Sequence, residues 1–214
     1  MITLSAFRSI PPFAQGLVRD FRVRWALEEA GIPYQERLIT RDDLATPAYR
    51  ALQPFGQVPA IETDALKLFE SGAIVLDIAE RSAALMPADV PGRARAKAWM
   101  FAALNTVEPA IQNLGEIDLF HAAEPWAVVR RPMVVEKVQT RLDALEAWLG
   151  GRDYLEDRFT AGDLLMVTVL RILRHTDLAT GRPPLKAYLA RCEARLAFRK
   201  AMESHLRPFE ANAA

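Results

Sequence analysis

Residues 57–71 read Gln-Val-Pro-Ala-Ile-Glu-Thr-Asp-Ala-Leu-Lys-Leu-Phe-Glu-Ser, and their pattern is the strongest indication of the fold. Two short runs rich in strand-forming residues, Val58 to Glu62 and Leu66 to Glu70, are separated by Thr63-Asp64-Ala65. This spacing predicts an antiparallel hairpin. Ser71 then caps a run with helical periodicity, so the order here is strand, strand, helix.

The sequence before this stretch predicts a further strand, helix, strand and helix. Ile2 to Phe7 is typical of a short strand, and Val18 to Ala30 has the apolar spacing of an amphipathic helix that Gly31 ends. Tyr34 to Thr40 is a second strand candidate, and Asp42 to Leu52 is weakly helical. The complete pattern is βαβαββα, in which the first βαβ unit favours parallel pairing.

The remainder of the chain has almost only helical periodicity. Leu85 to Gly92 contains two prolines and a glycine, the composition of a linker. We therefore expect domains at 1–84 and 93–214, the second an all-α bundle, joined by a linker at 85–92. Pro109 interrupts the first long helical run, which should bend or end near Asn105. The expected helices are Arg93 to His121, Pro125 to Leu149, Ala161 to His175, Leu185 to Glu193 and Ala197 to His205.

Composition excludes several classes of protein. The 214 residues include 27 lysines and arginines against 27 aspartates and glutamates, so no global positive charge favours a nucleic acid or an anionic membrane as partner. No basic leader and no long apolar span is evident, which predicts a cytoplasmic protein. The single cysteine, Cys192, allows no intrachain disulfide, and the three histidines have no ligand partners nearby, so no metal site is expected.

Val58-Pro59 is the first candidate binding motif. A proline that opens a strand can follow a cis peptide bond and present the backbone of the preceding residue outward. Val58 would then offer its N–H and C=O to an extended peptide ligand by strand-like pairing. The alternative is an ordinary trans proline at the start of a strand.

Glu70-Ser71 is the second candidate, because it falls where a strand ends and a helix begins. Free N–H groups and the positive end of the helix dipole favour a carboxylate there, and the Ser71 hydroxyl adds a donor. Glu70 has the charge to pair with an ammonium group on the same ligand. The alternative is a plain helix cap with a solvated glutamate.

Together these features resemble the cytosolic glutathione S-transferase superfamily, in its bacterial-type members. The resemblance covers essentially the whole chain and implies a thioredoxin-like α/β domain followed by an all-α bundle. Arg22 to Gly31, Arg-Val-Arg-Trp-Ala-Leu-Glu-Glu-Ala-Gly, is similar to the first helix of that family. Phe159-Thr160-Ala161-Gly162-Asp163 is similar to its N-capping box, which supports folding and not catalysis.

The resemblance implies glutathione as co-substrate and assigns its binding residues. Val58 and Pro59 match the pair whose backbone binds the cysteinyl part, and Glu70 and Ser71 match the residues that hold the γ-glutamyl group. Gln57 stands where relatives often have a glutamine or lysine near the glycyl end. A homodimer is implied as well.

The catalytic region departs from the family pattern. Relatives carry a tyrosine, serine or cysteine after the first strand, whereas Phe7 to Asp20 contains no tyrosine or cysteine and is several residues longer than usual. Ser9 is one candidate, because its hydroxyl can donate to a thiolate. Arg19 is the other, because its charge and the helix dipole both favour a thiolate. An ordinary loop serine and a solvated arginine are the alternatives.

The leading functional prediction is a glutathione S-transferase that conjugates the glutathione thiolate to a hydrophobic, electrophilic small molecule. Variants of the same fold isomerise, dehalogenate or reduce peroxides with glutathione. A second class is a non-catalytic module of this fold that binds other proteins. The binding motifs favour the first class, and the missing tyrosine keeps the second open.

Overall fold

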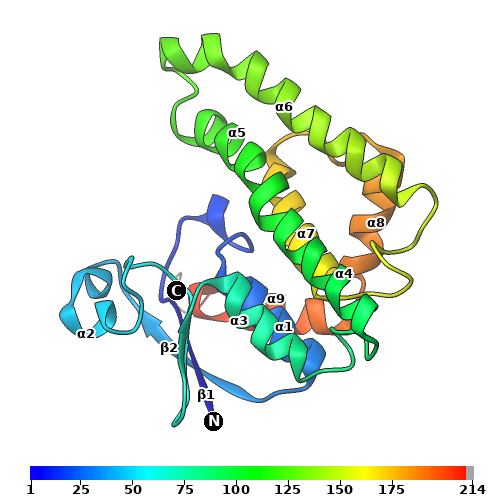
Figure 1. The fold of residues 1–214 in the computed structure, drawn as a ribbon. Helices are drawn as coiled ribbons and strands as arrows, with labels where there is room; N and C mark the ends of the chain where they lie inside the picture. Colours follow the sequence, from blue (N-terminus) through cyan, green and yellow to red (C-terminus); the bar gives the residue numbers. More distant parts are fainter. Residues whose placement is uncertain (211–214) are drawn as a thin grey trace. The chain divides into compact units, whose positions relative to one another are not determined.

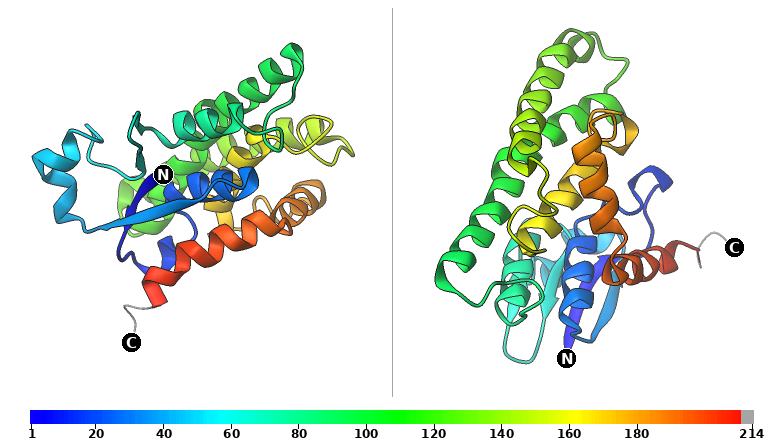
Figure 2. Two further views of the ribbon diagram at one scale, coloured as in Figure 1. Left: turned by 90° about the horizontal axis from the view of Figure 1, so that it is seen from below. Right: turned by 90° about the vertical axis from the view of Figure 1, so that its right-hand side faces the viewer.

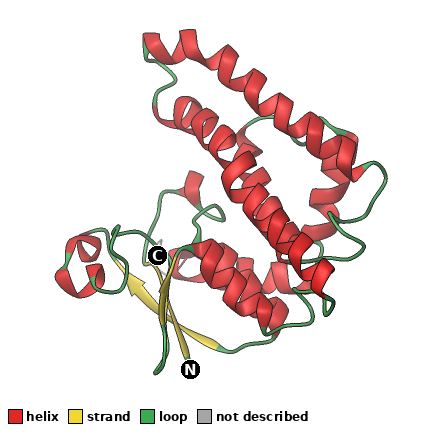
Figure 3. Cartoon of the chain, in the orientation of Figure 1, coloured by secondary structure: helices red, strands yellow, loops and turns green. Residues whose placement is uncertain are grey.

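The computed structural model describes residues 1–210, which form two compact units. Among the described residues, one unit contains Met1–Met86 together with residues 194–210, and the other is Pro87–Glu193. Every strand within residues 1–210 belongs to the first unit, and the second is helical (Figure 3). A thioredoxin-like domain and a helical domain were predicted, and both are present.

The first unit contains a four-stranded mixed sheet in the order β2-β1-β3-β4. Strands β1 and β2 are labelled in Figure 1. β1 pairs in parallel with β2 and antiparallel with β3, and β3 pairs antiparallel with β4. The predicted hairpin is therefore confirmed, although its strands are shorter than expected. The strand bounds are β1 (Ile2–Phe7), β2 (Tyr34–Ile39), β3 (Ala60–Glu62) and β4 (Lys67–Phe69).

Three helices complete the predicted βαβαββα order. They are α1 (Asp20–Ala30), α2 (Pro47–Arg50) and α3 (Ser71–Glu80), with 3₁₀ turns η1 (Pro12–Ala14) and η2 (Asp42–Ala45). Gly31 ends α1 in the left-handed conformation with φ 65°, which glycine adopts without a Cβ penalty. The weakly helical stretch after β2 divides into η2 and α2, because Thr46 and Pro47 start a new helix: the Thr46 hydroxyl accepts from the Tyr49 N–H.

The last described helix, α9 (Leu196–Glu210), lies alongside α1 and belongs to the first compact unit (Figures 1 and 2). Phe198 packs edge-on against Trp25 with ring centroids 4.9 Å apart. Both Arg195 nitrogens Nε and Nη2 pair with the Glu29 carboxylate, at 2.5 and 2.7 Å. The domain limits predicted from the sequence, 1–84 and 93–214, assign this helix to the helical domain. These limits stay a prediction.

The second unit is the predicted α bundle. Its first long run is interrupted by a π-helical stretch, η3 (Ala102–Val107), which ends two residues before Pro109 in the first turn of α5. Proline has no N–H for the carbonyl four residues earlier, which is that of Asn105, so the break falls where it was expected. The helices are α4 (Val90–Phe101), α5 (Glu108–Phe120), α6 (Pro125–Leu149), α7 (Ala161–Leu170), the 3₁₀ segment η4 (Arg171–His175) and α8 (Pro183–Glu193).

The start of α7 has the predicted capping box. The Thr160 hydroxyl accepts from the Gly162 N–H at 3.2 Å, and the Asp163 carboxylate accepts from the Thr160 N–H at 2.8 Å. Asp163 also accepts from the Leu155 N–H and the Tyr188 hydroxyl, at 2.8 and 3.0 Å. These bonds hold the loop before α7 and the neighbouring α8 to one buried carboxylate. In the part of the chain from residue 1 to 210, no helix has the length and apolarity to span a membrane.

Candidate functional site

The register of the β3–β4 hairpin brings the two candidate binding motifs to the same end of the sheet. Ala60 pairs directly with Phe69, so the residues before Ala60 and those after Phe69 leave the hairpin side by side. β1 runs antiparallel to β3, with Leu4 opposite Ile61, which places the carboxyl end of β1 at this end as well. The Val58-Pro59 turn, the start of α3 and the loop after β1 therefore share one edge.

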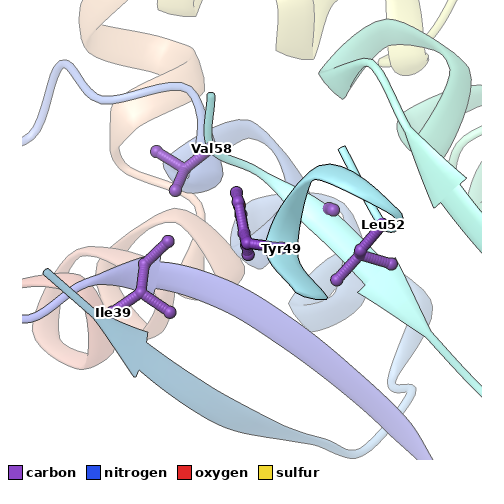
Figure 4. Close-up of a cluster of buried hydrophobic side chains, with 5 residues drawn as sticks. Ile39, Tyr49, Leu52 and Val58 are labelled. Carbon is purple, nitrogen blue, oxygen red and sulfur yellow. The ribbon is translucent and has the colours of Figure 1, made fainter. Parts of the chain in front are cut away.

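The Val58–Pro59 peptide bond is cis, one of the two arrangements that the sequence left open. The Val58 side chain is buried and packs against Ile39, Tyr49 and Leu52 (Figure 4). The side chain is packed, but the backbone groups of Val58 are unpaired. Within residues 1–210 neither the Val58 N–H nor its C=O forms a hydrogen bond. Most polar backbone groups in folded proteins are paired. The unpaired N–H and C=O of Val58 are therefore suited to a ligand that pairs with them as a neighbouring strand would.

Glu70 has an unusual backbone conformation at the start of α3. Its φ is 67° and its ψ is 114°, and among residues 1–210 it is the one residue other than glycine with positive φ. Such a conformation costs on the order of 1–3 kcal/mol and is often retained at binding sites. The Glu70 side chain is exposed and forms no cap on the helix.

Ser71 was predicted to cap α3, and that prediction is wrong. Glu70 occupies the cap position, and Ser71 is the first helical residue. Its hydroxyl accepts instead from the buried Arg22 guanidinium of α1, with Nη1 and Oγ 3.4 Å apart. Because the hydroxyl accepts this bond, its own proton is available to a carboxylate. The first N–H groups of α3 have no side-chain cap and favour an anion.

Gln57 lies immediately before the turn and has an exposed side chain and a hydrogen-bonded backbone carbonyl. Its carbonyl accepts from the Tyr49 hydroxyl of α2 at 2.7 Å. On the far side of the turn, the Ala60 N–H donates to Ser5 Oγ of β1 at 2.8 Å. The turn is thus fixed from the buried side, while the Gln57 side chain remains exposed.

The two candidates for thiol activation occupy the long loop between β1 and α1. Ser9 is exposed two residues after β1 and has no hydrogen bond within residues 1–210. Arg19 is partly buried and lies at the cap position of α1, which confirms that it stands at the start of this helix. The structure brings both residues to the loop that leaves the shared edge, and their roles stay predictions.

A buried charge cluster fixes the start of α1 next to Arg19. Asp20 Oδ2 accepts from Arg24 Nε at 2.8 Å and lies 3.2 Å from His205 Nδ1 of α9. Burial opposes ionisation of Asp20, but His205 and Arg24 outweigh it and hold the pKa of this carboxyl below its ordinary value. Arg24 also donates to Glu36 at 2.6 Å. The carboxylate therefore stays charged and anchors α1 to α9.

Tyr49 and the Asp20 cluster were not recognised from the sequence as parts of this site, and neither was the contact between Ser5 and Tyr49. Thr46-Pro47 is a helix-start signal that would have placed Tyr49 on a short helix. Asp20 and Arg24 are four residues apart, the spacing of a helical ion pair. No local signal pairs Ser5 with Tyr49, because their contact depends on the tertiary fold.

Models of a known family match both halves of the chain. The N-terminal domain model of glutathione S-transferases matches residues 21–81, and the C-terminal domain model matches residues 131–195. Among curated relatives, glutathione S-transferase 3 of Zea mays is 33% identical over 198 residues, which are 84% of this chain and 86% of the relative. Glutathione S-transferase F9 of Arabidopsis thaliana is 33% identical over 149 residues, 67% of this chain and 66% of that protein.

Solved structures agree in fold. A glutathione transferase from Burkholderia graminis, crystallised with two glutathione molecules bound per subunit, has a TM-score of 0.82 at 28% identity, covering 95% of this chain and 88% of that one. Glutathione transferase F7 from Populus trichocarpa has a TM-score of 0.82 at 26% identity, covering 96% and 99%. With both domain models matched and a relative of similar length 33% identical, the chain belongs to the cytosolic glutathione S-transferase superfamily.

Proposed function

We propose that the protein binds glutathione at the end of its sheet and conjugates the glutathione thiolate to an electrophilic small molecule. The observation that carries this proposal is the pairing of Ala60 with Phe69, which sets the unpaired Val58 backbone beside the uncapped start of α3. An extended peptide with a charged head is complementary to that combination. The glutathione transferase from Burkholderia graminis, which was crystallised with glutathione bound, supports the choice of ligand.

Each part of glutathione has a proposed partner. The Val58 N–H and C=O pair with the cysteinyl backbone, next to Pro59. The γ-glutamyl carboxylate takes the Ser71 hydroxyl and the first N–H groups of α3, and the α-ammonium group pairs with Glu70. Gln57 donates to the glycyl carboxylate through its exposed side chain.

Catalysis requires that the bound thiol lose its proton to solvent and that its sulfur face the second substrate. The sulfur lone pair then forms a C–S bond to the electrophilic carbon, and the leaving group departs with the bonding electrons. Ser9 stabilises the thiolate by donating its hydroxyl proton in a hydrogen bond, or Arg19 does so by its charge at the start of α1. Conjugation of this kind detoxifies hydrophobic electrophiles.

A non-catalytic role is the second candidate, and one observation favours it. The loop from Phe7 to Asp20 contains no tyrosine or cysteine, the residues with which many relatives handle the thiol. Such a protein would bind glutathione or another protein without turning over an electrophile. Isomerisation, dehalogenation or peroxide reduction with glutathione are alternative reactions for the same site. A cytoplasmic homodimer is part of the proposal in either case.

Binding is tested by retention on immobilised glutathione and by calorimetric titration. We expect retention, with at least about a tenfold loss of affinity in Glu70→Gln, because a charge-assisted bond contributes about 1.5–3 kcal/mol. Glu136→Gln, which alters an exposed carboxylate on α6, is the matched control and should bind as the wild type does. A wild-type protein that shows no retention and no heat of binding would refute the proposal.

Catalysis is tested with a chloro-dinitrobenzene electrophile and by the absorbance of bound thiolate as a function of pH. Loss of the activating residue should raise the pKa of bound glutathione by about one unit or more. Ser9→Ala and Arg19→Ala, compared separately, identify which of the two residues acts. Glutathione binding without conjugation of any electrophile tested would support the non-catalytic candidate instead.

A further inference from the structure

Two buried hydroxyl groups lie directly behind the Val58-Pro59 turn. The Tyr49 hydroxyl donates to the Gln57 carbonyl at 2.7 Å. Ser5 Oγ accepts from the Ala60 N–H at 2.8 Å and lies 3.1 Å from the Ala60 carbonyl, to which it donates. The two hydroxyl oxygens are 3.0 Å apart. The residues that flank the turn on both sides are therefore held by one pair of side chains.

The positions of these bonds determine where the turn points its free backbone groups. The Gln57 carbonyl and the Val58 N–H belong to one trans peptide group, so they point in opposite directions. Because Tyr49 holds the carbonyl from the buried side, the Val58 N–H is directed away from the core. By the same geometry, the bond between Ser5 and the Ala60 N–H directs the Pro59 carbonyl outward.

The same bonds strengthen the Val58 N–H as a donor. A hydrogen bond accepted by the Gln57 carbonyl polarises its peptide group, which makes the Val58 N–H a better donor. The Tyr49 ring is buried against Val58 and Ile39 (Figure 4), and Thr46 caps its short helix, so the hydroxyl has little freedom to move. Burial raises the pKa of Tyr49, which keeps the hydroxyl protonated as a donor.

We propose that Tyr49 and Ser5 are positioning residues for glutathione: they act through the backbone of Val58 and touch no ligand themselves. This inference rests on the proposed function and extends it to two residues on α2 and β1. If it holds, the pair sets the affinity for the cysteinyl backbone and leaves the reaction of the thiolate unchanged. Loss of either hydroxyl should then raise the KM for glutathione, with kcat and the KM for the electrophile near the wild-type values.

The test compares Tyr49→Phe and Ser5→Ala with a matched control, Tyr34→Phe. Tyr34 also has a hydroxyl bond at about the same length, 2.9 Å to Ser204 Oγ, but in a different part of the first unit. Calorimetry should show glutathione affinity reduced about five- to tenfold in Tyr49→Phe, the effect expected from one net hydrogen bond and a weakened donor. Tyr34→Phe should stay within about twofold of the wild type.

Amide hydrogen exchange provides a readout that needs no ligand. The Ala60 amide, which donates to Ser5 Oγ, should exchange faster in Ser5→Ala than in the wild type, and at the wild-type rate in Tyr34→Phe. Wild-type affinity in Tyr49→Phe, or unchanged exchange of the Ala60 amide in Ser5→Ala, would overturn the positioning role while leaving the proposed function intact. If wild-type protein bound no glutathione, the proposed function would fail first, and the positioning role would fail with it.

Discussion

The starts of α3 and α7 are two helix N-termini with opposite arrangements. At α7 the first turn is buried and closed, because Thr160 and Asp163 bond to the backbone and to each other. At α3 the cap residue Glu70 has positive φ, its side chain forms no cap, and the carboxylate is exposed. The N–H groups of the first turn therefore have side-chain partners within the protein at α7 and have no side-chain cap at α3.

The difference separates residues that support folding from residues suited to binding. A helix N-terminus has N–H groups that need partners, and a buried one must find them within the protein. The α7 terminus finds them in its own capping box, whereas the α3 terminus has room for an anion. Substitutions at three residues, Asp163, Asp20 and Glu70, test this distinction.

Asp163→Ala would open the closed terminus. It removes a buried carboxylate that accepts bonds from Leu155, Thr160 and Tyr188, and leaves those donors without partners. We expect a loss of about 4 kcal/mol in the free energy of unfolding, measured by urea denaturation. Asp157→Ala, at an exposed position two residues after Leu155, is the control and should change it by less than about 0.5 kcal/mol. A small effect of Asp163→Ala would mean that the box is dispensable.

Glutathione affinity of the fraction that remains folded is the second measurement on Asp163→Ala. It should equal that of the wild type, because the proposed ligand partners belong to the other compact unit. A loss of affinity that exceeds the unfolded fraction would contradict the separation of the two roles.

The start of α1 provides a third terminus, and it differs from α7 in pH dependence. Both Asp20 and Asp163 are buried, but at Asp20 the effect of burial is outweighed by His205 and Arg24, which hold its pKa below the ordinary value. Burial raises the pKa of Asp163, opposed only in part by donated hydrogen bonds. The contribution of Asp20 is therefore present above about pH 4 and lost as the pH falls through its folded-state pKa. The contribution of Asp163 to stability is present at low pH and is lost as the pH rises through its folded-state pKa.

Asp20→Asn should therefore lower the free energy of unfolding by about 2 kcal/mol at neutral pH. On acidification to about pH 3 this variant should lose less stability than the wild type does. Asp163→Asn should lose more stability than the wild type over the same pH range, because it lacks the gain in stability that accompanies protonation of Asp163. Urea denaturation at several pH values measures both slopes. Parallel profiles for the two variants would show that the two carboxylates do not differ as described.

Glu70→Gly tests the open terminus and gives the smallest change in stability. Glycine adopts positive φ without a Cβ penalty, so the free energy of unfolding should rise by about 1 kcal/mol while glutathione affinity falls. Glu70→Gln, which keeps the strain and removes the charge, should lose affinity at unchanged stability. If Glu70→Gly lowered both quantities together, the strained backbone would be part of the fold and not a feature of the site.

The sequence alone was sufficient for the order of the elements and for the bundle. Hydrophobic periodicity and the signals at Gly31, Pro109 and Thr160 are local, so they can be recognised without the tertiary structure. The cap of α3 was misassigned, because serine is a frequent cap residue whereas the positive φ of Glu70 arises from the connection between β4 and the helix.

The site was predicted less completely than the fold. The motifs at Val58-Pro59 and Glu70-Ser71 are contiguous in sequence, and their proximity follows from the hairpin register. The contact between Ser5 and Tyr49 spans 44 residues, and that between Asp20 and His205 spans 185. Contacts of that range carry no periodic or spacing signal, so one sequence without tertiary information does not reveal them.

The docking of α9 on α1 has a consequence for synthesis of the chain on the ribosome. Phe198 covers Phe21 and Trp25. His205 and Arg195 pair with Asp20 and Glu29. The first unit therefore lacks the residues that cover this side of α1 until α9 has been made. Translation adds on the order of 5–20 residues per second, which leaves the aromatic side of α1 uncovered for several seconds while the intervening helical unit emerges. The nascent N-terminal segment is thus exposed to chaperones and to aggregation during that interval, although the finished unit is compact.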